Sequence, residues 1–154
     1  MRGLTVQEEL FAILARFRKH QYAITSDVEK MFRQISVDPE DQDLQCILCC
    51  EKQNDSLRTF KLTTVTYGTT SALFMVTQCL VSLAEIEKNI YPEAASVIRR
   101  DFYMYDLMTG AETIAGCIQL QAQISNILSS ARLPLRKWCS KGRYILIHRC
   151  VRPW

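Results

Sequence analysis

Two long segments of the sequence repeat apolar residues every three or four positions, the spacing of one face of an α-helix. The first segment follows Gly68 and carries its apolar residues from Ala72 to Ile86, with Pro92 beyond its expected end. The second covers residues 113–131 and is followed by Pro134, which cannot continue a helix. These two helices are the longest elements expected, so the shorter segments around them decide the fold class.

The shorter segments change to the two-residue period that is typical of β-strands. Residues 22–28 alternate in this way and end at an acidic side chain, and residues 102–108 have the extended character of a hairpin with Tyr105 and Asp106 at its tip. Residues 44–50 and 58–65 form a further expected strand pair, and shorter helices are expected at residues 8–20 and 29–35. This order of elements predicts an α+β fold.

The composition is that of one globular domain. Hydrophobic residues make up 48% of the 154 residues and charged residues 23%, which argues against a disordered or fibrous chain. The apolar run at residues 71–86 is interrupted by polar side chains and is shorter than the roughly 20 residues that span a bilayer, so no membrane segment is expected. With an odd count of 7 cysteines and no secretory signal, we expect an intracellular, reducing location.

Three of the cysteines, Cys46, Cys49 and Cys50, include one CxxC pair. A structural zinc site needs four ligands, and no second pair follows at a suitable spacing, while His148 and Cys150 lie far along the chain. We therefore expect free thiols here rather than zinc ligands.

From Arg132 onward the chain has basic but no acidic residues, although the whole protein carries a net charge of only +3. Such an end is compatible with contacts to phosphates. Composition alone favours a solvated or disordered tail. Lys137 within it is likewise interpreted as a surface cation, the alternative being a proton donor to pyrophosphate.

Two carboxylates, Asp27 and Asp106, fall at the ends of expected strands that a long helix separates. Antiparallel neighbours in one sheet could bring them together, and paired carboxylates are the ligands with which two-metal phosphoryl transfer holds its divalent ions. From spacing alone, solvated charges at strand ends are the more common arrangement.

Four ordered motifs carry a resemblance to a known family. They are AITSDVEKMF at residues 23–32, TVTYG at 64–68 with Ser71 and Ala72 following, DFYMYDL at 101–107 and LRKWCS at 135–140. In this order and spacing they resemble the reverse transcriptase of Pao/BEL-type long-terminal-repeat retrotransposons, over roughly residues 4–140. The resemblance implies a fragmentary palm-like domain at 1–140, in which an antiparallel sheet packs against two long helices, with partial fingers and no thumb. Residues 141–154 would then be a divergent basic tail.

The resemblance also implies metal ligands. Asp27 matches the first metal-binding aspartate of the family, the carbonyl of Val28 would add an oxygen ligand, and Asp106 matches an aspartate of the hairpin turn. The implied cofactor is Mg²⁺, and the implied substrates and partners are deoxynucleotide triphosphates and an RNA or DNA template with its primer.

A nucleotide-binding role is implied for Val28 as well and for three more residues. Phe32 matches the bulky residue that excludes a ribose 2′-hydroxyl, and Tyr67 and Gly68 match the turn that faces the incoming nucleotide and template. Core packing remains an additional or alternative role for Phe32. For Tyr67 and Gly68 the alternative is a plain turn before the long helix.

The chain departs from the family at a decisive position. Relatives carry Tyr-x-Asp-Asp in the hairpin turn, whereas this chain has Tyr103-Met104-Tyr105-Asp106, so that Tyr105 replaces a metal-binding aspartate. A phenol with a pKa of about 10 is neutral at physiological pH and is a poor magnesium ligand. We therefore expect the chain to be catalytically inactive.

Further departures agree with this expectation. Leu73 replaces a proline of the family, Cys49 and Cys50 replace an aromatic-basic pair, and Lys141 replaces an asparagine, beyond which the resemblance ends. Two alternatives stay open: a non-enzymatic remnant that binds nucleic acid, and an unrelated interaction domain built on the two long helices. The second alternative predicts that the two aspartates lie far apart.

Overall fold

The computed structural model of this chain describes residues 7–50, 52 and 56–141. Within these residues the fold is α+β, as the periodicities predict, and it contains a four-stranded antiparallel sheet, a separate two-stranded hairpin and five α-helices. The strands are β1 (Tyr22–Val28), β2 (Cys46–Cys49), β3 (Arg58–Lys61), β4 (Phe102–Tyr103), β5 (Asp106–Ala111) and β6 (Leu135–Ser140). The helices are α1 (Leu10–Phe17), α2 (Met31–Gln34), α3 (Ala72–Glu87), α4 (Pro92–Arg100) and α5 (Ile114–Ser130), with a 3₁₀ turn at Gln42–Leu44.

The main sheet has the strand order β4-β5-β1-β6, and every neighbouring pair is antiparallel. Its central strand β1 pairs with β5 without interruption, from Tyr22 opposite Ala111 to Asp27 opposite Asp106. Because successive side chains of a strand point to opposite faces, Ile24 and Val28 enter the core while Asp27 points to the other face.

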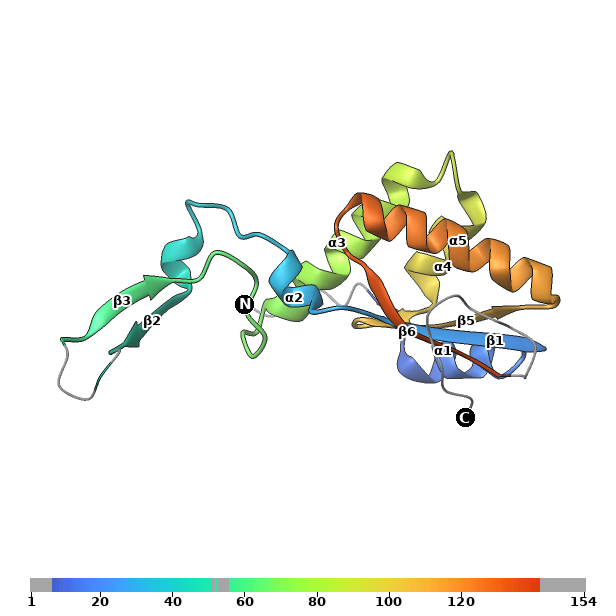
Figure 1. Cartoon of the computed structure of the whole chain (residues 1–154), viewed down its shortest axis with the longest axis horizontal. Coiled ribbons are helices and arrows are strands. Elements are labelled where there is room, and N and C mark those ends of the chain that lie inside the picture. Colours follow the sequence, from blue (N-terminus) through green and yellow to red (C-terminus); the bar gives the residue numbers. More distant parts are fainter. Residues whose placement is uncertain (1–6, 51, 53–55, 142–154) are drawn as a thin grey trace.

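One face of this sheet and three helices form the hydrophobic core. Helix α5 packs on β1, β5 and β6, and α3 and α4 pack against it and against each other (Figure 1). Ile24, Leu107, Ile124, Ile127 and Trp138 are buried members of this core. Each side chain of this size contributes about 1.5–3 kcal/mol when fully buried, so these contacts hold the sheet to the helices.

Helix α1 packs on the opposite side of the sheet, against β4 and β5 (Figure 1). Ile13 of α1 is fully buried there and does not belong to the main core. The helix covers only part of this face. Residues at the junction of β1, β5 and β6 line an open hollow, which includes Asp27 and Asp106.

Two elements differ from the sequence-based expectation. Pro92 was expected to follow the end of a long helix, and it also begins a second helix, α4, because the missing N–H of proline costs nothing in the first turn. The basic segment after Arg132, for which composition favours a solvated tail, contains the edge strand β6. That interpretation was wrong for residues 135–140, since Trp138 of this strand is buried in the core.

Candidate functional site

Asp27 and Asp106 lie directly opposite each other in the β1–β5 pair. Side chains in such a pair have Cβ atoms roughly 4.5–5.5 Å apart, so both carboxylates share one site on the face opposite α5. They line an open hollow of about 430 Å³ with Thr25, Ser26, Tyr105, Leu107, Met108, Lys137 and Cys139. This juxtaposition contradicts the alternative of an interaction domain in which the two aspartates lie far apart.

Tyr105 lies in the tight turn between β4 and β5, beside Asp106, and its side chain is 40% exposed. Met104, the preceding residue, has a positive φ of 57°, which lets the chain reverse within two residues. The carbonyl oxygen of Tyr105 accepts a hydrogen bond of 3.0 Å from the N–H of Val28. The turn at Tyr105 is therefore attached to β1 through the backbone. This hydrogen bond does not depend on which side chain occupies the position.

The surroundings of Asp106 shift the pKa of its carboxyl group. Partial burial raises the pKa of Asp106, the negative charge of Asp27 raises it further, and the positive charge of Lys137 opposes both effects. These directions are those expected for two like charges that share a partly desolvated site with one cation nearby.

The cation is Lys137, whose Nζ lies 3.3 Å from Oδ2 of Asp27. Its side chain is 77% exposed, as a surface cation would be, and yet its ammonium group is directed at the carboxylate pair. The sequence contained no direct signal for this contact, because Asp27 and Lys137 are separated by 110 positions.

The position of Lys137 follows from an irregularity in β6. The β1–β6 register shifts between Thr25 and Asp27, so that Lys137 and Trp138 together face Ser26. Such a β-bulge bends the strand and redirects its side chains. The backbone of Lys137 has φ 52°, in the left-handed region, and the hydroxyl of Ser26 donates a 2.6 Å hydrogen bond to the carbonyl of Arg136.

The carboxylate pair fits one Mg²⁺, which usually takes one or two protein carboxylates and completes its shell with water or phosphate. The donor set falls short of a two-ion site, since the neighbouring residue Tyr105 supplies a phenol and not a third carboxylate. Among the described residues, no group of three His, Cys, Asp or Glu side chains lies close enough to hold a metal.

Two of the expected nucleotide-binding residues, Phe32 and Tyr67, form a separate contact. The rings of Phe32 and Tyr67 meet edge to face, with centroids 6.4 Å apart and an interplanar angle of 71°. Gly68 follows with φ 92° and with open space around its α-carbon, so this glycine is needed for its backbone conformation. Phe32 also packs against the core, and none of the three residues lines the carboxylate hollow.

The cysteines considered as zinc ligands, Cys46, Cys49 and Cys50, are exposed free thiols on or beside β2. His148, Cys150 and the rest of the basic tail from residue 142 lie outside the described residues.

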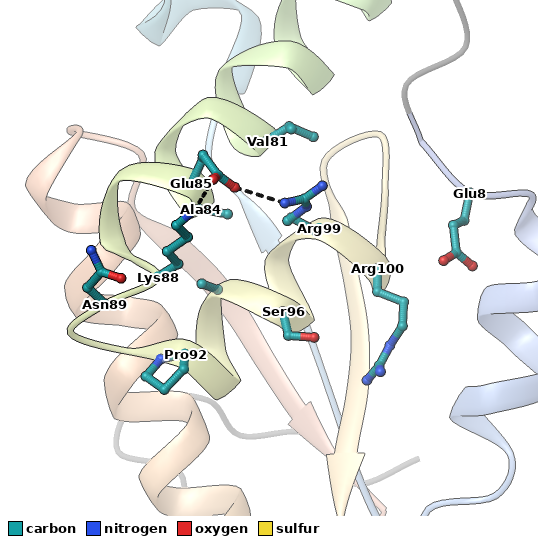
Figure 2. A pocket seen from close by; sticks show the side chains of 11 residues that line it. Glu8, Val81, Ala84, Glu85, Lys88, Asn89, Pro92, Ser96, Arg99 and Arg100 are labelled. Atoms are coloured by element: carbon teal, nitrogen blue, oxygen red, sulfur yellow. Dashed lines mark hydrogen bonds and ion pairs between the residues drawn. The ribbon is translucent and has the colours of Figure 1, made fainter.

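A second hollow, of about 760 Å³, lies between α3 and α4 (Figure 2). Glu85 of α3 lines this hollow, forms an ion pair with Lys88 and accepts a 2.9 Å hydrogen bond from Arg99. Arg100 pairs with Asp101 in the same region. The charged side chains that line this hollow already have partners. We therefore interpret the hollow as a packing gap between the helices and not as a binding site.

A scan of the sequence against known protein families found no match, and a search among curated proteins found no significant relative. No helix within the described part of the chain is both long and apolar enough to cross a membrane.

Proposed function

We propose that this chain is a degenerate palm fragment of a Pao/BEL-type retrotransposon reverse transcriptase and that it does not polymerise DNA by itself. The observation that carries the proposal is the pairing of Asp27 with Asp106 across adjacent antiparallel strands. The two aspartates are 79 positions apart in the sequence (27 to 106). An arrangement that brings both motifs to one site supports their shared origin in a metal-dependent phosphoryl-transfer site.

In this proposal Asp27, Asp106 and the backbone carbonyl of Val28 would hold Mg²⁺. When bound, that ion neutralises phosphate charge and activates an attacking hydroxyl. The chain's own contribution is to hold two carboxylates on rigid strands, with their separation determined by the β1–β5 register.

The nucleotide roles are assigned to the Phe32–Tyr67 contact and to Gly68. An edge-to-face ring pair limits the movement of Phe32, and a rigid bulky side chain is suited to excluding a 2′-hydroxyl from deoxynucleotide triphosphates. The RNA or DNA template and its primer would pass Gly68, where the structure leaves open space.

The β2–β3 hairpin corresponds in this proposal to partial fingers, and the main sheet with α3 and α5 corresponds to the palm, while no element of the described residues is assigned to a thumb. One feature supports inactivity. Tyr105 removes one carboxylate from the expected set.

Primer extension tests both parts of the proposal. The full chain, given Mg²⁺, deoxynucleotide triphosphates and a primed RNA template, should extend no primer, and extension would contradict the assigned inactivity. Residues 23–140 of this chain should then replace the equivalent palm segment of an active Pao/BEL reverse transcriptase, with and without Tyr105→Asp. We expect activity only with Tyr105→Asp, and none with the matched control Tyr103→Asp. A chimera that folds but stays inactive with Tyr105→Asp would argue against the family assignment.

A further inference from the structure

Lys137 extends from the edge strand β6 over the hollow that contains both aspartates. Its Nζ lies 3.3 Å from Asp27, and its charge also acts on Asp106. One side-chain cation therefore interacts with the same two carboxylates that would bind a divalent ion.

The backbone is bent to place this side chain. Lys137 has φ 52°, a left-handed conformation that costs free energy for any residue with a β-carbon, and it lies in the β-bulge opposite Ser26. The 2.6 Å hydrogen bond from Ser26 to the carbonyl of Arg136 holds the strand together beside the bulge. Strained backbone of this kind is common beside functional sites, where it directs a side chain.

Burial of the neighbouring Trp138 is one reason for the bulge, since this side chain is only 6% exposed. That reason does not account for a lysine at position 137. Glycine or asparagine would take the left-handed conformation with less strain and would bury Trp138 equally well. The contact of Lys137 with Asp27 accounts for the charge at this position.

We propose that Lys137 is a built-in counter-ion of the Asp27–Asp106 pair, and that a divalent cation enters this hollow only in competition with the Lys137 ammonium. The inference rests on the proposed function only in treating the carboxylate pair as a cation site. Because the Lys137 ammonium is covalently attached, its local concentration at the carboxylates does not depend on the concentration of metal. A higher concentration of metal is therefore needed to displace it. It also repels an incoming divalent ion.

The test uses the full chain and Mn²⁺ as a paramagnetic probe, with free Mn²⁺ measured by electron paramagnetic resonance. Lys137→Asn removes the charge and tolerates the left-handed backbone. We expect it to bind Mn²⁺ about tenfold more tightly than the unmodified chain at low ionic strength, with a smaller gain at high salt because exposed charges are screened. Lys137→Arg keeps the charge and should bind as weakly as the unmodified chain.

Arg132→Asn is the matched control. Arg132 also has a left-handed backbone, with φ 59°, and its replacement removes the same charge, but it does not line the hollow. This variant should bind Mn²⁺ as the unmodified chain does. Adding Asp27→Asn to Lys137→Asn should abolish the gain.

Equal binding by the unmodified chain and Lys137→Asn, or no binding by either, would overturn the inference. So would a gain that survives Asp27→Asn, because the ion would then be elsewhere. If circular dichroism shows that Lys137→Asn does not fold, Lys137→Gly carries the same comparison, since glycine adopts this conformation at least cost. The measurement needs no nucleotide or template, so its outcome is separate from that of primer extension.

Discussion

Gly110 of β5 pairs with Ala23 of β1 at the point where the chain enters the sheet from α1. A β-carbon at Gly110 would lie 2.3 Å from the carbonyl oxygen of Tyr22 and 2.7 Å from Cβ of His20. The oxygen belongs to the backbone of the central strand, so it cannot move aside without disturbing the β1–β5 register. Close approach of another backbone explains why this position holds a glycine.

We expect Gly110→Ala to lower the free energy of unfolding by about 3 kcal/mol, the upper range for overpacking a well-packed site. Urea unfolding followed by circular dichroism measures the change. The control is Gly116→Ala in the first turns of α5, where an added β-carbon meets Oγ1 of Thr113 at 3.1 Å. There the better helix propensity of alanine, up to about 1 kcal/mol, offsets the tight contact. Equal losses in the two variants would contradict the crowding at Gly110.

At the scale of elements, α1 is attached to the sheet by a buried carboxylate as well as by Ile13. Asp101, which is 1% exposed, accepts hydrogen bonds from Nε of Arg16 and of Arg100, both at 3.2 Å, and from Thr109 at 2.9 Å. Arg16 also donates to Glu8, which precedes α1. One side chain thus connects α1, the end of α4 and β5.

Removing the charge of Asp101 should loosen this connection. We expect Asp101→Asn to cost about 2 kcal/mol, because Arg16 and Arg100 would keep their charges in a partly buried place without the anion. Thermal unfolding at neutral pH reports the loss. Glu8→Gln, which removes the exposed partner of Arg16, should change stability by less than about 0.5 kcal/mol. A larger loss of stability in Glu8→Gln than in Asp101→Asn would contradict the role of Asp101 in attaching α1.

The edges of the main sheet are both unfavourable for pairing with another chain. Strand β4 has only 2 residues, and β6 carries the bulge together with the exposed charges of Arg136 and Lys137. Short, bent or charged edge strands discourage further strand addition. The basic residues of β6 thus discourage another strand from pairing at this edge of the sheet. Arg136 also forms a 2.7 Å ion pair with Glu29.

At the scale of the whole molecule, the structure has a packed body and a projecting hairpin. Figure 1 shows β2 and β3 extending away from the main sheet, and all residues of both strands are exposed. The hairpin is connected to the body through hydrogen bonds near Val37 and Thr63 and a bridge between Ser36 and Thr64. A two-stranded hairpin without a covering layer is marginally stable in water.

Hydrogen exchange should separate these two regions. Backbone amides of Cys46–Cys49 and Arg58–Lys61 should exchange at least about a hundredfold faster than those of Tyr22–Val28, because opening the hairpin does not require opening the core. Mass spectrometry of peptic peptides measures both rates in one sample, so the central strand is an internal control. Equal protection of the two regions would show that the hairpin unfolds together with the body.

Local sequence pattern determined much of the fold. Helical periodicity predicted α3 and α5, and alternation predicted β1 and the β4–β5 hairpin, because both periods follow from which face of an element is buried. The same reasoning identified Asp27 and Asp106 as acids at strand ends. Element bounds were less accurate. Strand β3 ends at Lys61 and not at Val65, since Thr63 and Thr64 instead bond to the segment after α2.

Only the tertiary structure decided what meets at the site. The β1–β5 register places Asp27 opposite Asp106, and the bulge in β6 brings Lys137 to the same pair from 110 positions away. No local pattern encodes such contacts, because strand register and bulges depend on the packing of side chains from distant segments, here including Trp138 in the core. The sequence by itself thus identified the acids, and the folded sheet supplied their partner.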